Sequence, residues 1–429
     1  MSNIDPNSSA PESPEEAAES GTLISSLALR QRAGGVGVPA ATVLVAFLMG
    51  GLVVLATGHN PLLAYRDIFN GAGLNWIFHP TTDTANTSAY NLSQTLLQTT
   101  TLILTGLAVA FAFRCGMFNI GGQGQYFVGL YAANWVGYNF AGMATLPHIV
   151  LGIGAATLAG AAWAGIAGVL KATVGAHEVV TTIMLNYVAQ WLLRFLIIGG
   201  PLELRAGTSK SLPIGDGARL ATFLPNSDTL QIFGLPASVY RVHVGLVIAV
   251  VAVGVFAILL WRTSLGYEIR AAGQSQKAAR YAGVSVRRTI IVTMLIAGAF
   301  AGLAGAIQIA GVDHNLTDKY FSDTTGFDAI AVALLGLGSA VGIVLAAILF
   351  GALHAGGAVM QADAGISSSL VLVLQALILF SIAANFLNAI RLRIPGLGQA
   401  PSAPAPGAVG AALMTEAAAA PPQEGTITT

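Results

Sequence analysis

The sequence has 429 residues, of which 55% are hydrophobic and only 9% charged, and its mean hydropathy is +0.72. Soluble domains carry about one quarter charged residues, so this composition excludes an ordinary soluble enzyme and indicates a protein that spans a lipid bilayer. The formal net charge of zero excludes a basic nucleic-acid-binding protein, and the single cysteine, Cys115, excludes an intramolecular disulfide and a cysteine-based zinc cluster.

Both ends of the chain are expected to be disordered tails. Residues 1–37 begin with MSNIDPNSSAPESPEEAAES, which is acidic and rich in Pro and Ser and lacks the basic start of a cleaved signal peptide. Residues 394–429 are of low complexity, rich in Ala, Pro and Gly. The segment between them, 38–393, is therefore expected to form one transmembrane domain.

The next feature in chain order is a series of apolar windows. A helix needs about 20 mostly apolar residues to cross the roughly 30 Å of hydrocarbon in a bilayer. Windows of about this length lie at 38–57, 92–113, 123–140, 148–170, 179–198, 243–261, 289–311, 341–360 and 366–390. A further window, 327–337, is shorter, and we expect it to continue into its neighbour or to form half of a broken helix. The sequence thus predicts an all-α polytopic membrane protein with about ten transmembrane helices.

Basic residues beside these windows predict the orientation, because Lys and Arg are retained on the cytoplasmic side. With ten crossings, one face receives Arg30, Arg32, Arg114, Lys171, the basic cluster within 262–288, Arg391 and Arg393. We therefore expect both termini to be cytoplasmic. The longer polar stretches 58–91 and 199–240 are then expected on the outer face.

The Gly-rich stretch RCGMFNIGGQGQ joins the second window to the third. A phosphate-binding loop would follow a strand and fit GxGxxG or GxxxxGK[ST]; this stretch follows an apolar helix, so we reject an enzymatic site. Its amides, Asn119, Gln123 and Gln125, must be satisfied by protein, water or a solute. They either bond between helices that the glycines let pack closely, or line a polar route through the membrane.

Two further stretches place polar side chains at the start of a window. In GAHEVVTTIMLNY, Glu178 is followed by Thr182 and Asn186 on one helical face. In GFDAIAVALLG, Asp328 opens the short window, where it can cap the helix. For Glu178 and Asp328, capping or packing and contact with a solute or gate both stay open. His177 is expected to be an interfacial residue, since no second ligand stands at metal-binding spacing.

The segment 262–288 lies within WRTSLGYEIRAAGQSQKAARYAGVSVRRTI and is the largest cytoplasmic stretch expected. Ser275 is a good N-cap and Gly283 a good C-terminal stop, which predicts a helix over 276–282 outside the membrane. Isolated helices below roughly 12 residues are marginal in water. We therefore expect this helix to dock on a cytoplasmic protein, with an ordinary positively charged loop as the other interpretation.

This segment resembles the coupling loop of ABC importer permease subunits, in the branch that serves simple sugars, nucleosides and branched-chain amino acids. The matching residues are Gly266, Arg270, Ala271, Gly273, Ala278, Ala279, Ala282 and Gly283. The stretches MFNIGGQGQ, HEVVTTIMLNY and GFDAIAVALLG look like those of the nucleoside-type members. The resemblance extends from about 92 to 393 and departs from the family in LLGLGSAVG, which lacks the expected Asn-containing turn.

The resemblance implies a multi-pass transport subunit of the inner (plasma) membrane that binds no cofactor and is not itself an enzyme. Two cytoplasmic ATPase domains, which use ATP and Mg, would dock around 276–282 and switch the permease between outward and inward openings. A second homologous permease subunit, or a second copy of this chain, would complete the membrane part. An extracellular substrate-binding lipoprotein of the basic-membrane-protein type would deliver the solute.

Within this scheme the expected pathway residues are Asn119, Gln123, Gln125, Glu178, Thr182, Asn186 and Asp328. Amides and hydroxyls of this kind suit a neutral solute such as a nucleoside or a simple sugar. The main alternative is a proton- or sodium-coupled secondary transporter of a small polar solute, but such carriers usually hold charges at mid-membrane, where these windows have almost none. A bulky replacement of Gly273 is expected to abolish transport through loss of ATPase docking.

Overall fold

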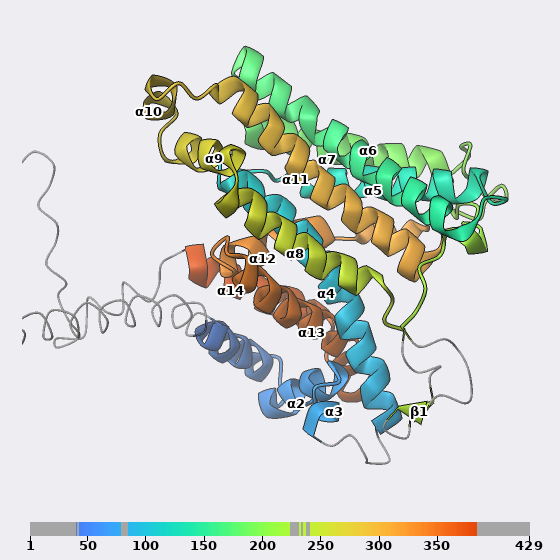
Figure 1. Ribbon diagram of the computed structural model, residues 1–429. Helices are drawn as coiled ribbons and strands as arrows, with labels where there is room; N and C mark the ends of the chain where they lie inside the picture. The colour runs from blue at the N-terminus through green and yellow to red at the C-terminus, as the bar shows by residue number, and fades with distance from the viewer. Residues whose placement is uncertain are drawn as a thin grey trace, which may run out of the picture. The chain divides into compact units, whose positions relative to one another are not determined.

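The computed structural model describes residues 40, 43–78, 85–223, 231–232, 235–236 and 241–383. The two predicted tails lie outside the described residues, as does the last window beyond 383. The described part consists mostly of helices joined by turns (Figure 1). Its short elements are α3 (Asn75–Phe78), η1 (Asp216–Ala218), and the antiparallel strands β1 (Gln231–Ile232) and β2 (Leu235–Pro236).

Each predicted window coincides with a helix. These helices are Val43–Ala56, α4 (Ala85–Phe113), α5 (Gly122–Asn139), α6 (Thr145–Val174), α7 (Glu178–Ile197), α8 (Gly245–Arg262), α11 (Val286–Gln308), α12 (Thr325–Leu335), α13 (Ala340–Ala364) and α14 (Ser369–Ala383). In the described part, six helices are long and apolar enough to cross a membrane, or seven if a pair bent by 120° counts as one. A helical protein with several apolar spans is thus confirmed, whereas the count of ten and the side of the termini stay predictions.

The polar stretch 58–91 is largely helical, and its expected place on the outer face stays a prediction. It contains α2 (Pro61–Gly71), α3 and the first turns of α4, and α2 is the second member of the bent pair. The signal for α2 was present in the sequence: the Asn60 side chain accepts a hydrogen bond at 2.9 Å from the backbone N–H of Leu62. This helix was not foreseen from the sequence, because the prediction weighed hydropathy and did not use this N-cap.

Glycines bring α5, α6 and α11 together at backbone distance. A Cβ added at Gly302 would lie 2.2 Å from the carbonyl oxygen of Ala156, and one at Gly129 would lie 2.6 Å from that of Gly302. Lipid chains supply no hydrophobic drive for helix association, so close packing of small residues has to hold these helices together. This three-helix contact forms the frame that carries the candidate site.

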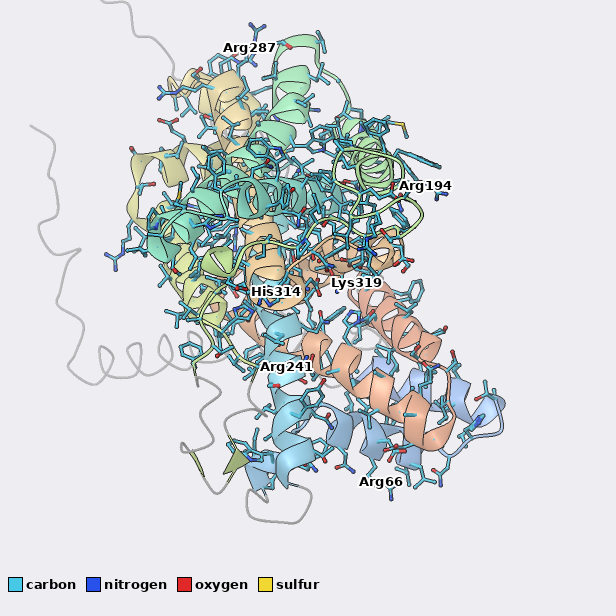
Figure 2. All side chains as sticks on the ribbon, turned by 90° about the vertical axis from the view of Figure 1, so that its right-hand side faces the viewer. Arg66, Arg194, Arg241, Arg287, His314 and Lys319 are labelled. Atoms are coloured by element: carbon cyan, nitrogen blue, oxygen red, sulfur yellow. The ribbon has the colours of Figure 1, made fainter. Side chains whose placement is uncertain are left out.

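The turns of the bundle gather at two ends. One end, here called the α9–α10 end, holds the turn 114–121, the helices α9 (Ser264–Gln274) and α10 (Gln276–Tyr281), and the turn 336–339. At the opposite end the segment 199–223 lies against the ends of α5 and α11, and the backbone N–H of Ile214 donates to the carbonyl oxygen of His314 at 2.8 Å. Arg287, in the first turn of α11, and His314, directly after the π-helical turn that continues α11, are labelled in Figure 2.

Between α11 and α13 the chain forms a broken element. α11 continues as a π-helical turn, η3 (Ile309–Asp313), and the chain returns through η4 (Asp318–Ser322) before α12 begins. The 11 residues of α12 rise about 16 Å, which is about half of the hydrocarbon thickness. The short window is thus a separate short helix that ends at Leu335 and does not run on into α13, and its role as half of a broken span stays a prediction.

Candidate functional site

Two pockets meet at the segment 322–324, which we call the wall because its residues line both of them. The first, the aromatic pocket, has a volume of about 460 Å³ and lies between α5, α7 and the start of α12. Its lining includes Phe127, Tyr187, Phe321, Phe327, Gln123 and Asn186. The second, the polar pocket, has a volume of about 270 Å³ and is lined by Gln98, Gln308, Lys319, Tyr320, Asp328 and His354.

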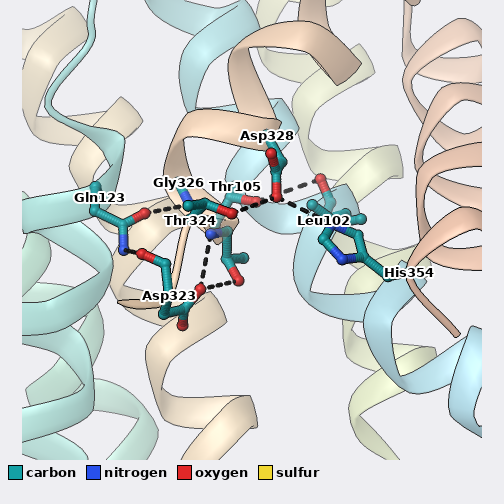
Figure 3. A network of polar contacts seen from close by, with 9 residues as sticks. Leu102, Thr105, Gln123, Asp323, Thr324, Gly326, Asp328 and His354 are labelled. Atoms are coloured by element: carbon teal, nitrogen blue, oxygen red, sulfur yellow. Dashed lines mark hydrogen bonds and ion pairs between the residues drawn. The ribbon is translucent and has the colours of Figure 1, made fainter. Parts of the chain in front are cut away.

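Gln123 of α5 holds the wall from the side of the aromatic pocket (Figure 3). Its Nε2 donates to the carbonyl oxygen of Asp323 at 2.8 Å, and its Oε1 accepts from the N–H of Gly326 at 2.5 Å. The side chain is buried, and a Cβ on Gly326 would lie 2.3 Å from the Gln123 Cα. Glycine at 326 therefore lets the two segments approach closely enough for both hydrogen bonds.

Asp328 does not cap α12, which corrects one interpretation of the sequence. The helix begins at Thr325, and it is Asp323 whose Oδ1 accepts from the Thr325 N–H at 2.8 Å. Asp328 lies in the first turn, where its Oδ2 accepts from the Thr324 hydroxyl and lies 3.1 Å from Nε2 of His354. Figure 3 shows this network joining the wall to α13 through His354.

Asn119 and Gln125 form a closed amide pair inside the turn before α5. Asn119 donates to Oε1 of Gln125 at 3.1 Å, and Gln125 donates back to Oδ1 of Asn119 at 3.0 Å. Each side chain is 1% exposed, and neither lines either pocket. The structure therefore places these two predicted pathway residues in helix packing, while it brings Gln123 to the wall.

Asn186 and Thr182 lie on the buried face of α7, as the spacing predicts. Asn186 lines the aromatic pocket, accepts from the N–H of Gly124 at 2.8 Å and donates to the carbonyl of Ile120 at 2.9 Å. The Thr182 hydroxyl donates to the Glu178 carbonyl at 2.7 Å within its own helix. Asn186 thus fixes α7 on α5 beside the pocket, whereas Thr182 lines neither of the two pockets.

Glu178 lies at the junction of α6 and α7. Its carboxylate is 2.7 Å from Nζ of Lys171, which joins the end of α6 to the start of α7. The residue lines neither pocket. In this structure the side chain forms an ion pair at a helix junction.

The polar pocket contains residues that the sequence did not single out. Gln308 accepts from the Thr101 hydroxyl at 2.9 Å and donates to Asp313 at 2.9 Å, and Asp313 also contacts Lys319 and Tyr320. His354 is the other omission. It was detectable as the one imidazole within the otherwise apolar window 341–360, a position where a polar side chain needs a partner.

The predicted cytoplasmic helix exists as α10. The Ser275 Oγ accepts from the Ala278 N–H at 3.3 Å, the helix ends at Tyr281, one residue before the predicted end, and Gly283 has a φ of +84°. On its surface Ala278 is exposed, whereas Ala279 is 3% exposed and faces inward. The side chain of Tyr281 is 94% exposed, which makes it the most prominent group on α10.

Three of the other residues matched to the coupling loop, Gly266, Ala271 and Gly273, pack within the chain. Gly266 faces the carbonyl oxygen of Leu259, which a Cβ would approach to 2.1 Å, and Ala271 packs on the core. A Cβ on Gly273 would lie 2.2 Å from the carbonyl oxygen of Arg114. The expected effect of a bulky residue at 273 therefore has a different physical reason: the clash occurs inside this chain and precedes any docking.

The described residues contain no candidate metal-binding site. Among the residues that the structure describes, no group of three His, Cys, Asp or Glu side chains stands close enough to hold a metal ion.

The sequence of this chain is similar to those of known transport proteins. Residues 91–383 match the family described as branched-chain amino acid transport system / permease component. The chain is 38% identical over 349 residues to the guanosine ABC transporter permease protein NupP of Bacillus subtilis (strain 168), covering 81% of this chain and 93% of that protein. No solved structure gives a significant match.

Two further relatives are similar over comparable lengths. The nucleoside ABC transporter permease protein NupB of Lactococcus lactis subsp. cremoris (strain MG1363) is 35% identical over 358 residues, covering 83% of this chain and 92% of that protein. The glucose ABC transporter permease protein TsgB13 of Haloferax volcanii is 36% identical over 365 residues, covering 83% of this chain and 90% of that protein.

Proposed function

The chain belongs to the family of branched-chain amino acid transport system permease components, and from this premise we propose that it carries a nucleoside across the membrane by alternating access. It is a multi-pass ABC transporter permease of the nucleoside and sugar import type. Relatives of similar identity are named for guanosine and for glucose, so their names alone leave both solutes open.

The observation that carries the choice of a nucleoside is the lining of the aromatic pocket. Its volume of about 460 Å³ lies within the range of small-molecule sites. The amides of Gln123 and Asn186 are already engaged in internal hydrogen bonds, which leaves ring surface as the main contact offered to a solute. Tyr187 is 56% and Phe327 44% exposed, and rings of this kind stack on a flat nucleobase.

Alternating access would need the wall to move, and the wall is held by individual hydrogen bonds. Gln123 holds it from α5, Asp328 of α12 accepts from Thr324, and Gln190 of α7 donates to the carbonyl of the preceding residue, Phe321, at 2.9 Å. A typical hydrogen bond contributes only about 0.5–1.5 kcal/mol net, so a modest driving force would release these contacts. Asn119, Gln125, Thr182 and Glu178 would then support the helices around the route, and Asp328 would line it on the polar side.

The driving force would come from a cytoplasmic ATPase that uses ATP and Mg and docks on α10. The α9–α10 end would be cytoplasmic, because its basic residues include Arg262, Arg270, Lys277, Arg280, Arg287 and Arg288. The exposed ring of Tyr281 would be a main contact, since aromatic side chains dominate interface energies. In this arrangement the chain lies in the inner (plasma) membrane, binds no cofactor and hydrolyses nothing itself.

Two other partners would complete the importer. Beside the aromatic pocket, Met184 is 54% and Trp191 64% exposed on α7, so a second permease subunit or a second copy could cover the route there. A substrate-binding lipoprotein would meet the opposite end, where 199–223 is packed on the ends of α5 and α11.

One observation favours a second candidate, a proton-coupled carrier. Asp328 and His354 form a titratable pair beside the polar pocket, and such pairs within membrane domains relay protons in secondary transporters.

Uptake of labelled guanosine by cells with and without this gene separates these functions. A nucleoside importer driven by ATP predicts gene-dependent uptake that survives excess unlabelled glucose and ribose and survives a protonophore when cellular ATP is maintained. Competition by the sugars would move the substrate to simple sugars. Collapse with the protonophore would favour the proton-coupled carrier, and absence of gene-dependent uptake would contradict the proposed substrate.

A further inference from the structure

Arg114, in the turn after α4, binds the far end of α12. Its Nη2 donates to the carbonyl oxygen of Gly338 at 2.8 Å and lies 3.4 Å from that of Leu337. Leu337 and Gly338 have φ values of 51° and 60° in the turn between α12 and α13. The last-turn carbonyls of Val332, Ala333 and Leu334 accept from the backbone N–H groups of 336–338, so Arg114 binds the turn that follows the helix. Its charge there also lies at the negative end of the helix dipole, which favours a cation.

On its other side Arg114 contacts α9. The guanidinium carbon of Arg114 lies 5.7 Å from the ring centroid of Trp261, and that of Arg270 lies 4.6 Å from the same ring. The backbone contact is closer still, because a Cβ on Gly273 would lie 2.2 Å from the Arg114 carbonyl oxygen. A movement of α9 therefore reaches Arg114 through its backbone and through a shared aromatic ring.

The charges at this contact are not neutralised by an acid. Among the ion pairs of the described residues none includes Arg114 or Arg270, and the Nη1 of Arg270 is buried without a hydrogen-bond partner. Burial, with the neighbouring charge of Arg270, lowers the pKa of Arg114. The carbonyls of the α12–α13 turn are consequently the groups that hold the Arg114 charge in place.

α12 is short and tightly packed, so it can transmit a displacement of its end. A Cβ on Gly106 of α4 would lie 2.9 Å from Cγ1 of Val332, which shows how closely α4 and α12 approach. At the opposite end of α12, the N–H of Gly326 is bound by Gln123, and Asp328 is paired with His354. Its 11 residues thus connect the turn that Arg114 binds to the wall of the two pockets, about 16 Å away.

We propose that Arg114 is a positioning residue that links the segment 262–288 to the wall, so that α9 and α12 move together. Arg114 itself touches no solute: it lines neither pocket. The identity of the driving ATPase rests on the proposed function, whereas the link from Arg114 to the wall does not.

A thiol placed on the wall tests this link in the purified permease without any substrate. Cys115 is the sole native cysteine and is 0% exposed, while Ser322 is exposed and lines both pockets. In the Ser322→Cys background, Arg114→Ala should change the rate of maleimide labelling by about tenfold, as expected for loss of a charge-assisted hydrogen bond. The labelling rate of Arg114→Lys should lie between that of Arg114→Ala and that of the protein with Arg114 intact, because lysine keeps the charge but lacks the planar guanidinium.

Arg241→Ala is the matched control. The Arg241 guanidinium also stacks on a ring, with its carbon 5.4 Å from the centroid of Tyr90. This contact lies at the opposite end of α4, and Arg241 lines neither pocket. Arg241→Ala should leave the labelling rate unchanged. A rate in Arg114→Ala equal to that of Arg241→Ala would overturn the proposal. If Arg114→Ala does not elute as a folded protein, the comparison of Arg114→Lys with Arg241→Lys decides in the same way.

A second measurement uses the assembled transporter with its ATPase in liposomes. Arg114→Ala should retain ATP hydrolysis while uptake falls, because the defect lies between docking and the wall. Parallel loss of hydrolysis and uptake would assign Arg114 to assembly and contradict the positioning role. Wild-type liposomes without ATP-dependent nucleoside uptake would refute the proposed function, and the thiol result would still decide the link.

Discussion

The carboxylate of Asp328 on α12 and the imidazole of His354 on α13 lie 3.1 Å apart, between Oδ2 and Nε2. The same oxygen accepts a hydrogen bond from Thr324, so one side chain ties the wall, α12 and α13 together. The side chains of Asp328 and His354 are 13% and 29% exposed, and both line the polar pocket. The contact therefore belongs to the site and also to the support of the wall.

Replacing His354 by Ala should reduce solute uptake strongly while the protein still folds. The change leaves a mostly buried carboxylate without its imidazole partner, which costs about 1–3 kcal/mol, or roughly five- to 150-fold in the population of the correctly arranged wall. Initial uptake rates check this, with His59→Ala as control, because His59 is exposed in the turn before α2. Equal rates in the two variants would show that the pair does not support the route.

Replacing Gln123 by Ala should destabilise the protein and slow uptake. The Gly326 N–H and the Asp323 carbonyl would both lose their partner, at about 1–3 kcal/mol for an unsatisfied buried group. Gln98→Ala is the matched control, since Gln98 is exposed and lines the polar pocket only. Thermal unfolding in detergent measures the effect, and a Gln123→Ala midpoint equal to that of Gln98→Ala would contradict the role of this amide.

Replacing Gly302 by Ala should prevent correct packing of α11 on α6. The new methyl group would lie 2.2 Å from the carbonyl oxygen of Ala156, a backbone atom that cannot move without shifting a helix. Gly254→Ala on α8 is the control, because a Cβ there would have no neighbour within 4 Å and Ala favours a helix by about 1 kcal/mol. The yield and the thermal unfolding midpoint are measured for both purified variants. Similar values for Gly302→Ala and Gly254→Ala would refute the close contact.

The protein should lose stability as the pH falls from 7 to 5 because of His243. This side chain is 1% exposed, and burial, with the charge of His314 nearby, lowers its pKa from 6.5 to about 4. Between pH 6.5 and about 4 the unfolded chain binds a proton at His243 that the folded chain does not. The free energy of unfolding therefore decreases as the pH falls through this range. The contribution of neutral His243 to stability is fully present only above pH 6.5. The loss between pH 7 and 5 should be about 2 kcal/mol.

Thermal unfolding midpoints at the two pH values, in the wild type and in His243→Asn, test this pH dependence. The variant should start less stable, because the Gly245 N–H loses its 3.0 Å bond to the imidazole Nδ1, but it should change less with pH. An equal change in both proteins would assign the pH dependence to other groups.

The apolar windows were predictable because lipid imposes a length and a composition on a spanning helix. The short helix α12 and the N-cap of α10 at Ser275 were predictable for local reasons, a short apolar window and a capping side chain. The helix α2 was not foreseen, although Asn60 marked its start.

The site was predictable only in part. Sequence reasoning identified Gln123, Asn186 and Asp328, which do lie at the pockets, but could not separate them from Asn119 and Gln125, which pair with each other. That separation depends on contacts between helices distant in the sequence, such as α5 with the start of α12. Arg114 was missed for the same reason, since its partner lies 224 residues away. His354 could have been found, because it is the one imidazole in an otherwise apolar window.

The measurement that tests the central claim most directly is protection of the wall by solute. In cells that carry the Ser322→Cys permease, a membrane-impermeant thiol reagent should block guanosine uptake, while the wild type, whose Cys115 is buried, should be insensitive. Guanosine at about ten times its Kd should slow the block by about tenfold, because an occupied pocket excludes the reagent, whereas glucose should not. A block that guanosine does not slow, or uptake that the modified thiol leaves unchanged, would contradict a nucleoside route at this wall.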